Sequence, residues 1–456
     1  MTELARPPRR FREIARGSLQ NAHMQAALDL STARLHTHRL EAWHALPDVE
    51  DLRQRAYDAR LRVIDDLDAH VARFREALEA RGGTTFLART ADEASAHVVD
   101  VCQDAGAKLV AKSKSMVSEE IAVNHALEAA GIRPVETDLG EYIMQLAGEH
   151  PAHIIAPAIE KTSQDIAELL SAVEAAPVPP ELGALTQAAR RQLRQVFLDA
   201  DVGITGANFA VSETGSICLV TNEGNGRLVS ALPRVHIVLL GMERLVGSLA
   251  DLAVLLRVLA RSGTGQRLSS YTTLITGPRR PGEQDGPEEL HVVILDNGRS
   301  SLVGGRYREM LACIRCGACL NVCPVYRKAG GGAYGPVYSG PMGAVLLPLL
   351  VGLEQASAHP HASSLCGACT EACPVKIPLH ELLLELRSDL VEERVVPWWE
   401  RAAFTLWSLA WSSPLGYRLT TALARFGQPL AGVAGPGRVW ARGRALPRLR
   451  RRFRDR

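Results

Sequence analysis

The chain has 456 residues, of which 46% are hydrophobic and 22% are charged, and its formal net charge is +2. This length predicts two or three domains with ordinary globular cores, and the small net charge gives no indication of a partner. No uninterrupted apolar run is long enough to span a membrane, so a transmembrane segment is not expected. An arginine pair near the start, with no apolar stretch after it, is typical of an arm and not of an export signal.

The first part of the chain is predicted to be helical. Residues 1–50 are rich in arginine and histidine and predict an arm with short helices. Residues 51–83 carry apolar residues at helical spacing and end in two glycines, which predicts one long amphipathic helix.

From residue 84 onward, short strand-like runs alternate with helical stretches. Helical patterns cover 91–105 and 119–130. The strand-like runs are 84–88, 108–113, 133–138, 153–158, 203–226 (broken by Gly, Asn and Thr), 235–241, 269–278 and 289–298. Strands that alternate with helices predict a largely parallel α/β sheet, so residues 51–303 are expected to form an α/β domain.

Residues 304–396 carry two groups of cysteines that both end in Cys-Pro-Val. The first group has the spacing Cys-x-x-Cys-x-x-Cys-x-x-x-Cys-Pro and consists of Cys313, Cys316, Cys319 and Cys323. The second group consists of Cys366, Cys369 and Cys373, with Ser363 where its first cysteine would stand. This spacing is typical of bacterial ferredoxins, in which three thiolates hold one cluster and the fourth reaches the other. A zinc site is the weaker alternative, because a four-cysteine run ending in Cys-Pro is poor zinc-ribbon spacing.

The ferredoxin crossover predicts the ligands of two iron–sulfur clusters. Cys313, Cys316 and Cys319 are expected to share the first cluster with Cys373, and Cys366 and Cys369 the second with Cys323. The second cluster then has three cysteines. Its fourth iron is bound by Ser363 or another oxygen ligand, by water or by a partner, or its corner is empty and the cluster is 3Fe–4S. Fewer thiolates tend to raise the reduction potential, so the two clusters are expected to differ.

The cysteines also indicate a compartment. Cys102 and Cys218 lie in apolar runs and are predicted to be buried small hydrophobic residues. Reduced thiols, oxygen-sensitive clusters and the absence of a signal predict a cytoplasmic location. The second half of 330–353, between the cysteine groups, predicts an apolar helix, and residues 381–395 predict another that Pro397 ends.

The α/β domain has polar residues where ligands bind in such sheets, at strand ends and Gly-rich turns. Lys112, Lys114, Glu119 and Glu120 lie at the end of the strand at 108–113 and in the helix that follows, and the turns contribute Glu213, Thr214, Thr221, Asn222, Glu223 and Asn225. The lysines either hold an anion at a helix N-terminus or face solvent, with the glutamates complementing the helix dipole. Walker A, Gly-x-Ser-x-Gly and His-Glu-x-x-His motifs are absent from the sequence, and the catalytic residues, if any, are unknown.

Residues 397–456 are predicted to form a C-terminal helix and a basic tail. The helix, at 402–411, is rich in tryptophan, and nine arginines follow from Arg438 onward. Such a segment docks on a partner or makes peripheral contact with an anionic membrane, or else it is a terminal helix with a solvated tail. Nucleic acid is not expected, because the tail has few aromatic residues to stack on bases.

Five blocks of the sequence resemble the lactate-utilisation iron–sulfur protein family, the B subunit of a three-part bacterial L-lactate oxidation system. They are KSKSMVSEEI (112–121), ETDLGEYIMQL (136–146), GITGANFAVSETGSICLVTNEGNGRL (203–228), CIRCGACLNVCPVY (313–326) and SLCGACTEACPVKI (364–377). The resemblance implies an α/β domain similar to isomerase and CoA-transferase-like folds, followed by a mostly α-helical, two-cluster ferredoxin-like domain. The family also has seven cluster cysteines.

The resemblance implies an electron-transfer subunit, not itself a catalyst, of an oxidoreductase complex that converts L-lactate to pyruvate and enables growth on lactate. The partners are then the other two subunits and an unidentified electron acceptor. Two alternatives stay open. One is an electron-transfer subunit of another flavin or heterodisulfide-type oxidoreductase, and the other is an α/β transferase or isomerase-like enzyme with regulatory clusters. No sequence pattern indicates a hydride-handling site, so the dehydrogenation is expected to occur elsewhere.

Overall fold

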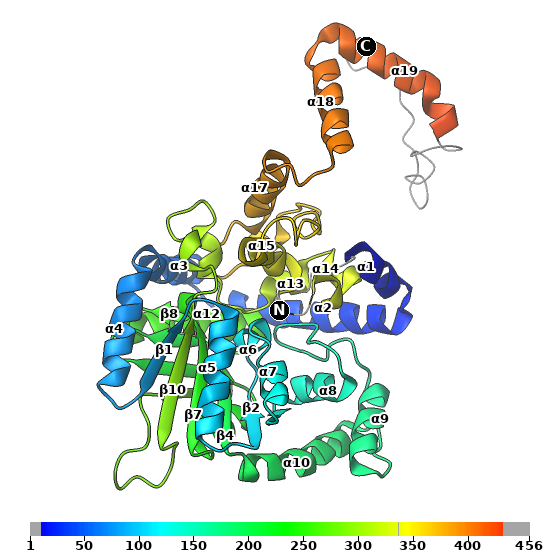
Figure 1. Cartoon of the computed structure of the whole chain (residues 1–456). Coiled ribbons are helices and arrows are strands. Elements are labelled where there is room, and N and C mark those ends of the chain that lie inside the picture. Colours follow the sequence, from blue (N-terminus) through cyan, green and yellow to red (C-terminus); the bar gives the residue numbers. More distant parts are fainter. Residues whose placement is uncertain (1–10, 336, 432–456) are drawn as a thin grey trace. The chain divides into compact units, whose positions relative to one another are not determined.

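The computed structural model describes residues 11–335 and 337–431. These fall into two units, residues 1–388 and residues 389–456, which are described separately. The first unit contains a parallel α/β sheet followed by a mostly helical cysteine-rich region, so the predicted fold class is confirmed (Figure 1).

The main sheet has six strands, and all their pairings are parallel. In spatial order they are β1 (Thr84–Ala88), β10 (Glu289–Leu295), β7 (Val235–Gly241), β4 (Val202–Gly206), β2 (Leu109–Lys112) and β3 (Arg133–Glu136). Every residue of the inner strand β7 is buried, as expected for a parallel sheet that is covered on both faces. The carboxyl ends of these strands therefore lie along one edge of the sheet, where loops can gather functional residues.

The two faces of the main sheet pack against different elements. Val235, Ile237 and Leu239 of β7 face a core that includes residues of α5 (Ala91–Asp104) and α7 (Val123–Ala129). The alternate residues Val238 and Leu240 face α4 (Leu67–Glu79) and a second sheet. That sheet has the order β8 (Leu245–Val246), β5 (Phe209–Val211), β6 (Ser216–Thr221) and β9 (Tyr271–Ile275). The period-2 alternation of buried residues in β7 thus contributes to a separate hydrophobic core on each face of the main sheet.

Further helices flank the strands and extend this domain. Helices α8 (Leu139–Ala147), α9 (Ser163–Glu174) and α10 (Leu182–Asp199) form a small core of their own beside β3, in which Tyr142, Leu170 and Leu193 meet. The other helices of the domain are α6 (Met116–Glu120), α11 (Asn225–Ala231) and α12 (Leu249–Gly263).

The N-terminal segment differs from its prediction. Instead of an arm with short helices, it forms α1 (Phe11–Gln20) and a 23-residue helix, α2 (Ala22–His44). Leu28 and Trp43 of α2 are buried in the same core as the cysteine-rich region. Tertiary packing of these side chains stabilises the helix.

The single long helix predicted at 51–83 is also wrong, because the chain forms α3 (Val49–Asp65) and then α4. Asp66 separates them with φ −134° and ψ 47°, which is outside the helical region. The break lets α4 cover the main sheet while Arg60 of α3 reaches the cysteine-rich region.

The strand predicted at 153–158 is wrong as well, because this segment forms turns. The backbone N–H groups of Ile155 and Ala156 donate to Nδ1 of His153, at 3.0 and 3.2 Å. A side chain that captures the backbone donors removes them from any strand ladder.

The cysteine-rich region consists of short helices around α15 (Gly340–Val351), the apolar helix predicted between the cysteine groups. The others are η4 (Arg308–Ala312), α13 (Ala318–Val322), α14 (Tyr326–Ala329), η5 (Gly332–Tyr334), α16 (Ala368–Ala372) and α17 (Leu379–Glu392). Helix α17 ends five residues before Pro397, because Arg394 has a positive φ of 61°.

The second unit contains α18 (Trp398–Ser412) and α19 (Pro414–Ala431). Trp411 of α18 contacts Trp407 and, edge to face, Tyr417 of α19. Within the residues that the structure describes, no helix combines the length and apolarity needed to cross a membrane. The arginine-rich tail from Arg438 lies outside the described residues, so its predicted role stays a prediction.

Candidate functional site

The two cysteine motifs share one loop geometry. In the first, Cys316-Gly317-Ala318-Cys319 leads into α13, and in the second, Cys366-Gly367-Ala368-Cys369 leads into α16. Gly317 and Gly367 have φ values of +74° and +80°, and the residues before the first cysteine of each loop, Arg315 and Leu365, have +57° and +54°. Left-handed residues turn successive backbone N–H groups inward, which is the geometry of loops that hold iron–sulfur clusters.

Four thiols from both motifs surround one cavity, which is lined by Cys313, Cys316, Cys319 and Cys373. We call these four the first thiol group. Cys373 is therefore separated from its own motif and meets the cysteines of the other one. Burial raises the pKa of Cys316 and of Cys373 to about 12, and the nearby Cys313 raises the pKa of both further.

The remaining three cysteines, Cys323, Cys366 and Cys369, form the second thiol group. Burial raises the pKa of Cys369 to about 11, and the thiolates of Cys323 and Cys366 contribute to this shift because they lie close by. Cys366 is exposed, whereas Cys323 and Cys369 are buried. Ser363 lies near this group in sequence, and its hydroxyl oxygen accepts a hydrogen bond from the N–H of Leu365 at 3.1 Å.

The chemistry of these donors fits iron–sulfur clusters. Buried thiolates need a compensating positive charge, which cluster iron supplies, and thiolate is the ligand that such iron prefers. Over the described residues, no three Cys, His, Asp or Glu side chains converge on a position for a single metal ion. The thiols of the first group line one cavity.

Arginines hold the loops of the first thiol group from several sides. Their guanidinium groups donate to backbone carbonyls, and they come from α2, from α3 and from the segment after β7. The hydrogen bonds run from Arg39 to Ala372 (2.9 Å), Arg53 to Cys373 (2.8 Å), Arg60 to Leu311 (3.0 Å) and Arg244 to Cys313 (2.8 Å). Burial lowers the pKa of Arg60 to about 9, so its guanidinium is still charged at neutral pH.

A buried ion network lies beside the first thiol group. Arg299 donates to Glu120 and to Glu243, each at 2.6 Å, and Arg315 donates to Glu243 at 3.0 Å. Arg315 also stacks over the ring of Tyr338 at 4.5 Å. Burial alone would raise the pKa of Glu243, but Arg299, Arg315 and Arg244 outweigh it and lower the pKa to about 2.

This network corrects the interpretation of Glu120 as a residue that only complements a helix dipole, because Glu120 is fully buried and ion-paired. Sequence reasoning did not find the other members, Arg299, Glu243, Arg315 and Tyr338. Arg299 and Glu120 are 179 positions apart, so no local spacing could connect them. Only the position of Arg315 between Cys313 and Cys316 was a usable signal in the sequence.

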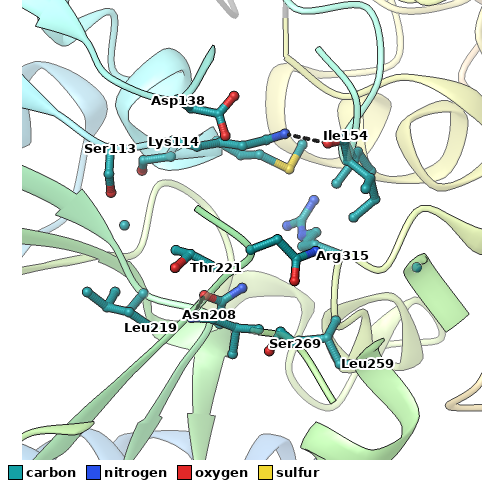
Figure 2. A pocket seen from close by; sticks show the side chains of 18 of the residues that line it. Ser113, Lys114, Asp138, Ile154, Asn208, Leu219, Thr221, Leu259, Ser269 and Arg315 are labelled. Carbon is teal, nitrogen blue, oxygen red and sulfur yellow. Dashed lines mark hydrogen bonds between the residues drawn. The ribbon is translucent and has the colours of Figure 1, made fainter. Parts of the chain in front are cut away.

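The second cavity of the site has a volume of about 370 Å³ and lies at the carboxyl ends of adjacent strands. We call it the strand-end pocket. Its walls include Asp138 after β3, Ser113 to Val117 after β2, Gly206 to Asn208 after β4, and Glu243 and Arg244 after β7. Figure 2 shows Lys114 and Asp138 on one side of it, with Asn208, Thr221 and Leu219 opposite.

Several residues predicted to form a ligand site do line this pocket. They are Lys114, Thr221, Asn222, Glu223 and Asn225. Lys112 does not line it and faces neither ligand nor solvent, because it is buried and pairs with Glu136 at 2.5 Å and with Glu119 at 3.6 Å. Glu213 and Thr214 are likewise absent from the lining; they stand in the turn after β5.

The strand-end pocket and the cavity of the first thiol group share a wall. Arg315 and Ile154 line both cavities. Ile154 belongs to the turn at 153–158 that was predicted to be a strand, so the turn brings this side chain between the α/β domain and the cysteine loops.

These features define an α/β domain of one known type joined to a two-cluster ferredoxin-like region. Residues 71–295 match the family model described as the LUD domain, and residues 309–377 match the 4Fe-4S dicluster domain. A solved structure described as a DUF162 family protein from Deinococcus radiodurans aligns with 50% of this chain and 98% of its own, with 15% identity and a TM-score of 0.29.

Curated relatives match over almost the whole chain. The lactate utilization protein B of Bacillus velezensis is 48% identical and that of Bacillus licheniformis 46%, each over 98% of this chain and 96% of the relative. The protein of the same name from Bacillus thuringiensis is 44% identical over the same shares. The chain belongs to the lactate utilization protein B family.

Proposed function

We propose that this protein is an iron–sulfur electron-transfer subunit of a complex that oxidises L-lactate to pyruvate. The observation that carries the proposal is the meeting of Cys373 with Cys313, Cys316 and Cys319 around one cavity. This interleaving of two motifs is the ligand pattern of two-cluster ferredoxins, which pass electrons between adjacent clusters. Family membership supplies the link to lactate, because the relatives are named for its utilization.

The proposed first cluster is 4Fe–4S and is held by the first thiol group. The proposed second cluster is held by Cys323, Cys366 and Cys369. Its fourth corner is bound by the oxygen of Ser363, by another oxygen ligand, by water or by a partner, or it is empty as in a 3Fe–4S cluster. When bound, the clusters accept and release single electrons.

The residues of the chain control these electrons without taking part in bond making. The thiols hold the clusters, the apolar helix α15 and the α/β domain exclude water from the first one, and the arginines supply positive charge beside it. The partners of this electron transfer are then the other two subunits of the lactate system and an unidentified electron acceptor. The protein is proposed to act in the cytoplasm, where its thiols stay reduced.

Anaerobic spectroscopy tests this function. The purified chain should contain about seven to eight irons with acid-labile sulfide, as expected for two cubanes with one labile corner. Adding L-lactate should bleach the cluster absorbance only when the partner subunits are present. Cys316→Ala should abolish this electron flow, and Cys102→Ala should not, because Cys102 is buried in the α/β core.

Two results would contradict the proposal. One is stoichiometric zinc without sulfide in place of iron. The other is oxidation of lactate by the purified chain alone with an artificial acceptor, which would make the α/β domain the catalytic site.

A further inference from the structure

The strand-end pocket has the position and size of a ligand site. Four adjacent strands of the main sheet, β7, β4, β2 and β3, send the residues after their carboxyl ends into its walls. In open parallel sheets this is the edge where ligands bind. Its volume of about 370 Å³ lies within the usual range for small-molecule sites.

The lining divides into a polar and an apolar part. Lys114, Asn208 and Thr221 bring an ammonium, an amide and a hydroxyl group to the pocket, and Arg315 brings a guanidinium group (Figure 2). Met116, Ile155, Leu219 and Leu259 form apolar walls. A mostly apolar pocket with a few convergent polar groups is the usual form of a site for a small organic molecule.

The charges favour an anion in spite of three carboxylates in the lining. Asp138 accepts from the N–H of Glu141 and Glu223 from that of Leu139, so both carboxylates are directed at the N-terminus of α8. Burial raises the pKa of Glu223, although the nearby charge of Lys114 acts against this shift. Glu243 is held by Arg299 and Arg315. The hydrogen bonds of Lys114 and of Arg244, which also lines the pocket, go to backbone carbonyls, those of Ile155 at 3.2 Å and Cys313 at 2.8 Å among them.

We propose that the strand-end pocket binds a small organic carboxylate, with Lys114 as its main cationic contact and Arg315 at the inner end. The class of ligand rests on the lining. The choice of L-lactate and pyruvate as probes rests on the function proposed above, because both are carboxylates of that reaction.

Because the two cavities share a wall, a ligand in the strand-end pocket should also affect the first cluster. Arg315 lines the pocket and the cavity of the first thiol group, so an anion bound in the pocket adds negative charge close to the first cluster. Negative charge disfavours the reduced cluster, which carries one more electron. Occupancy of the pocket therefore lowers the midpoint potential of the first cluster and leaves that of the second nearly unchanged.

The binding test uses the full chain with both clusters reconstituted anaerobically. Calorimetric titration with L-lactate and with pyruvate should give saturable binding of at least one acid. Lactamide, which has nearly the shape of lactate but no charge, should bind at least about tenfold more weakly, the loss expected when a charge-assisted contact is removed.

Two pairs of variants locate the site. Lys114→Met should weaken the acid about tenfold, whereas Lys108→Met, at the other end of β2 and exposed, should leave the affinity unchanged. Ser269 lines the pocket, so the larger side chain of Ser269→Trp should occupy part of it and weaken binding of the acid without removing a charge. A redox titration followed by EPR should show the potential of the first cluster falling when the acid is present.

Three outcomes would overturn the proposal: no saturable binding of either acid, equal binding of lactamide, or equal affinities of Lys114→Met and Lys108→Met. These outcomes are separate from the proposed function. If the chain is an electron carrier without a carboxylate site, lactate and the partner subunits would still bleach the clusters.

Discussion

The first and second thiol groups have the same loop geometry but very different surroundings. The first has four thiols, of which Cys316, Cys319 and Cys373 are buried, and arginines from α2, α3 and the turn after β7 hold its loops. The second has three thiols, and one of them, Cys366, is exposed. A duplicated motif therefore fixes the backbone geometry of the two loops, while the elements packed around each copy set its charge and its access to solvent.

This difference suits a relay with two distinct ends. The arginines stabilise added negative charge and raise the potential of the proposed first cluster, whereas burial lowers it. At the second cluster, solvent exposure and the missing thiolate act in the same upward direction. We expect the exposed second group to exchange electrons with a partner protein, because electron transfer requires close approach, and the enclosed first group to exchange them within the chain.

The largest expected effect follows from the interleaved ligands. Cys373→Ala and Cys313→Ala should each remove the EPR signal of the first cluster and about four irons per chain, because both thiols line one cavity. Cys323→Ala and Cys366→Ala should instead damage the signal of the second cluster. Iron analysis and EPR of the four variants check this grouping.

A different grouping of the cysteines would contradict the comparison of the two thiol groups. If Cys323→Ala resembled Cys313→Ala, each motif would hold its own cluster, and the two surroundings described above would no longer belong to separate clusters. Cys218→Ala is the matched control for a buried thiol outside both groups and should retain both signals.

How far the sequence predicts this site depends on the distance over which each feature is encoded. The cysteine spacing is local, and so are the strand patterns, which is why the loops and the parallel sheet could be predicted. The buried network of Arg299, Glu120 and Glu243 joins residues far apart in the chain, and only folding brings them together. No period or motif signals such a pairing.

Local reasoning also failed where a side chain competes with the backbone or where packing overrides composition. His153 takes the N–H groups of the segment that was predicted to be a strand. Helix α2 forms because Leu28 and Trp43 have a core to enter. Both errors lie at the border between the α/β domain and the cysteine-rich region, where tertiary contacts decide the structure.

The second expected effect concerns how strongly the residues around each of the two thiol groups contribute to the stability of the fold. Arg299→Met leaves the buried carboxylates of Glu120 and Glu243 without their shared partner, which should cost roughly 3–5 kcal/mol in the free energy of unfolding. Arg387→Met, near the second group, removes hydrogen bonds to the carbonyls of Pro360 and Ser363 and should cost roughly 1–2 kcal/mol. Anaerobic denaturant unfolding followed by circular dichroism compares the two. Equal losses would show that the ion network contributes no more than ordinary hydrogen bonds do.

The smallest expected effect is on potential, and it isolates the charges around the first group. Arg53 of α3 donates to the carbonyl of Cys373 and also pairs with Glu50 at 3.1 Å, whereas Arg55 on the same helix forms an exposed pair with Asp51. Arg53→Gln removes a positive charge next to a proposed ligand while keeping a side chain that can donate. It should therefore favour the oxidised first cluster by up to about tenfold, which is about 59 mV for a one-electron couple.

Arg55→Gln is the matched control, and it should leave both potentials unchanged because an exposed charge is screened by solvent. The second cluster should keep its potential in both variants, since Arg53 donates to the loop that ends at Cys373 and not to Cys366 or Cys369. EPR-monitored redox titrations give both midpoints in one sample. A fall of both midpoints in Arg53→Gln would mean that the charge acts over the whole cysteine-rich region, and the contrast between the two groups would then rest on thiol number and exposure alone.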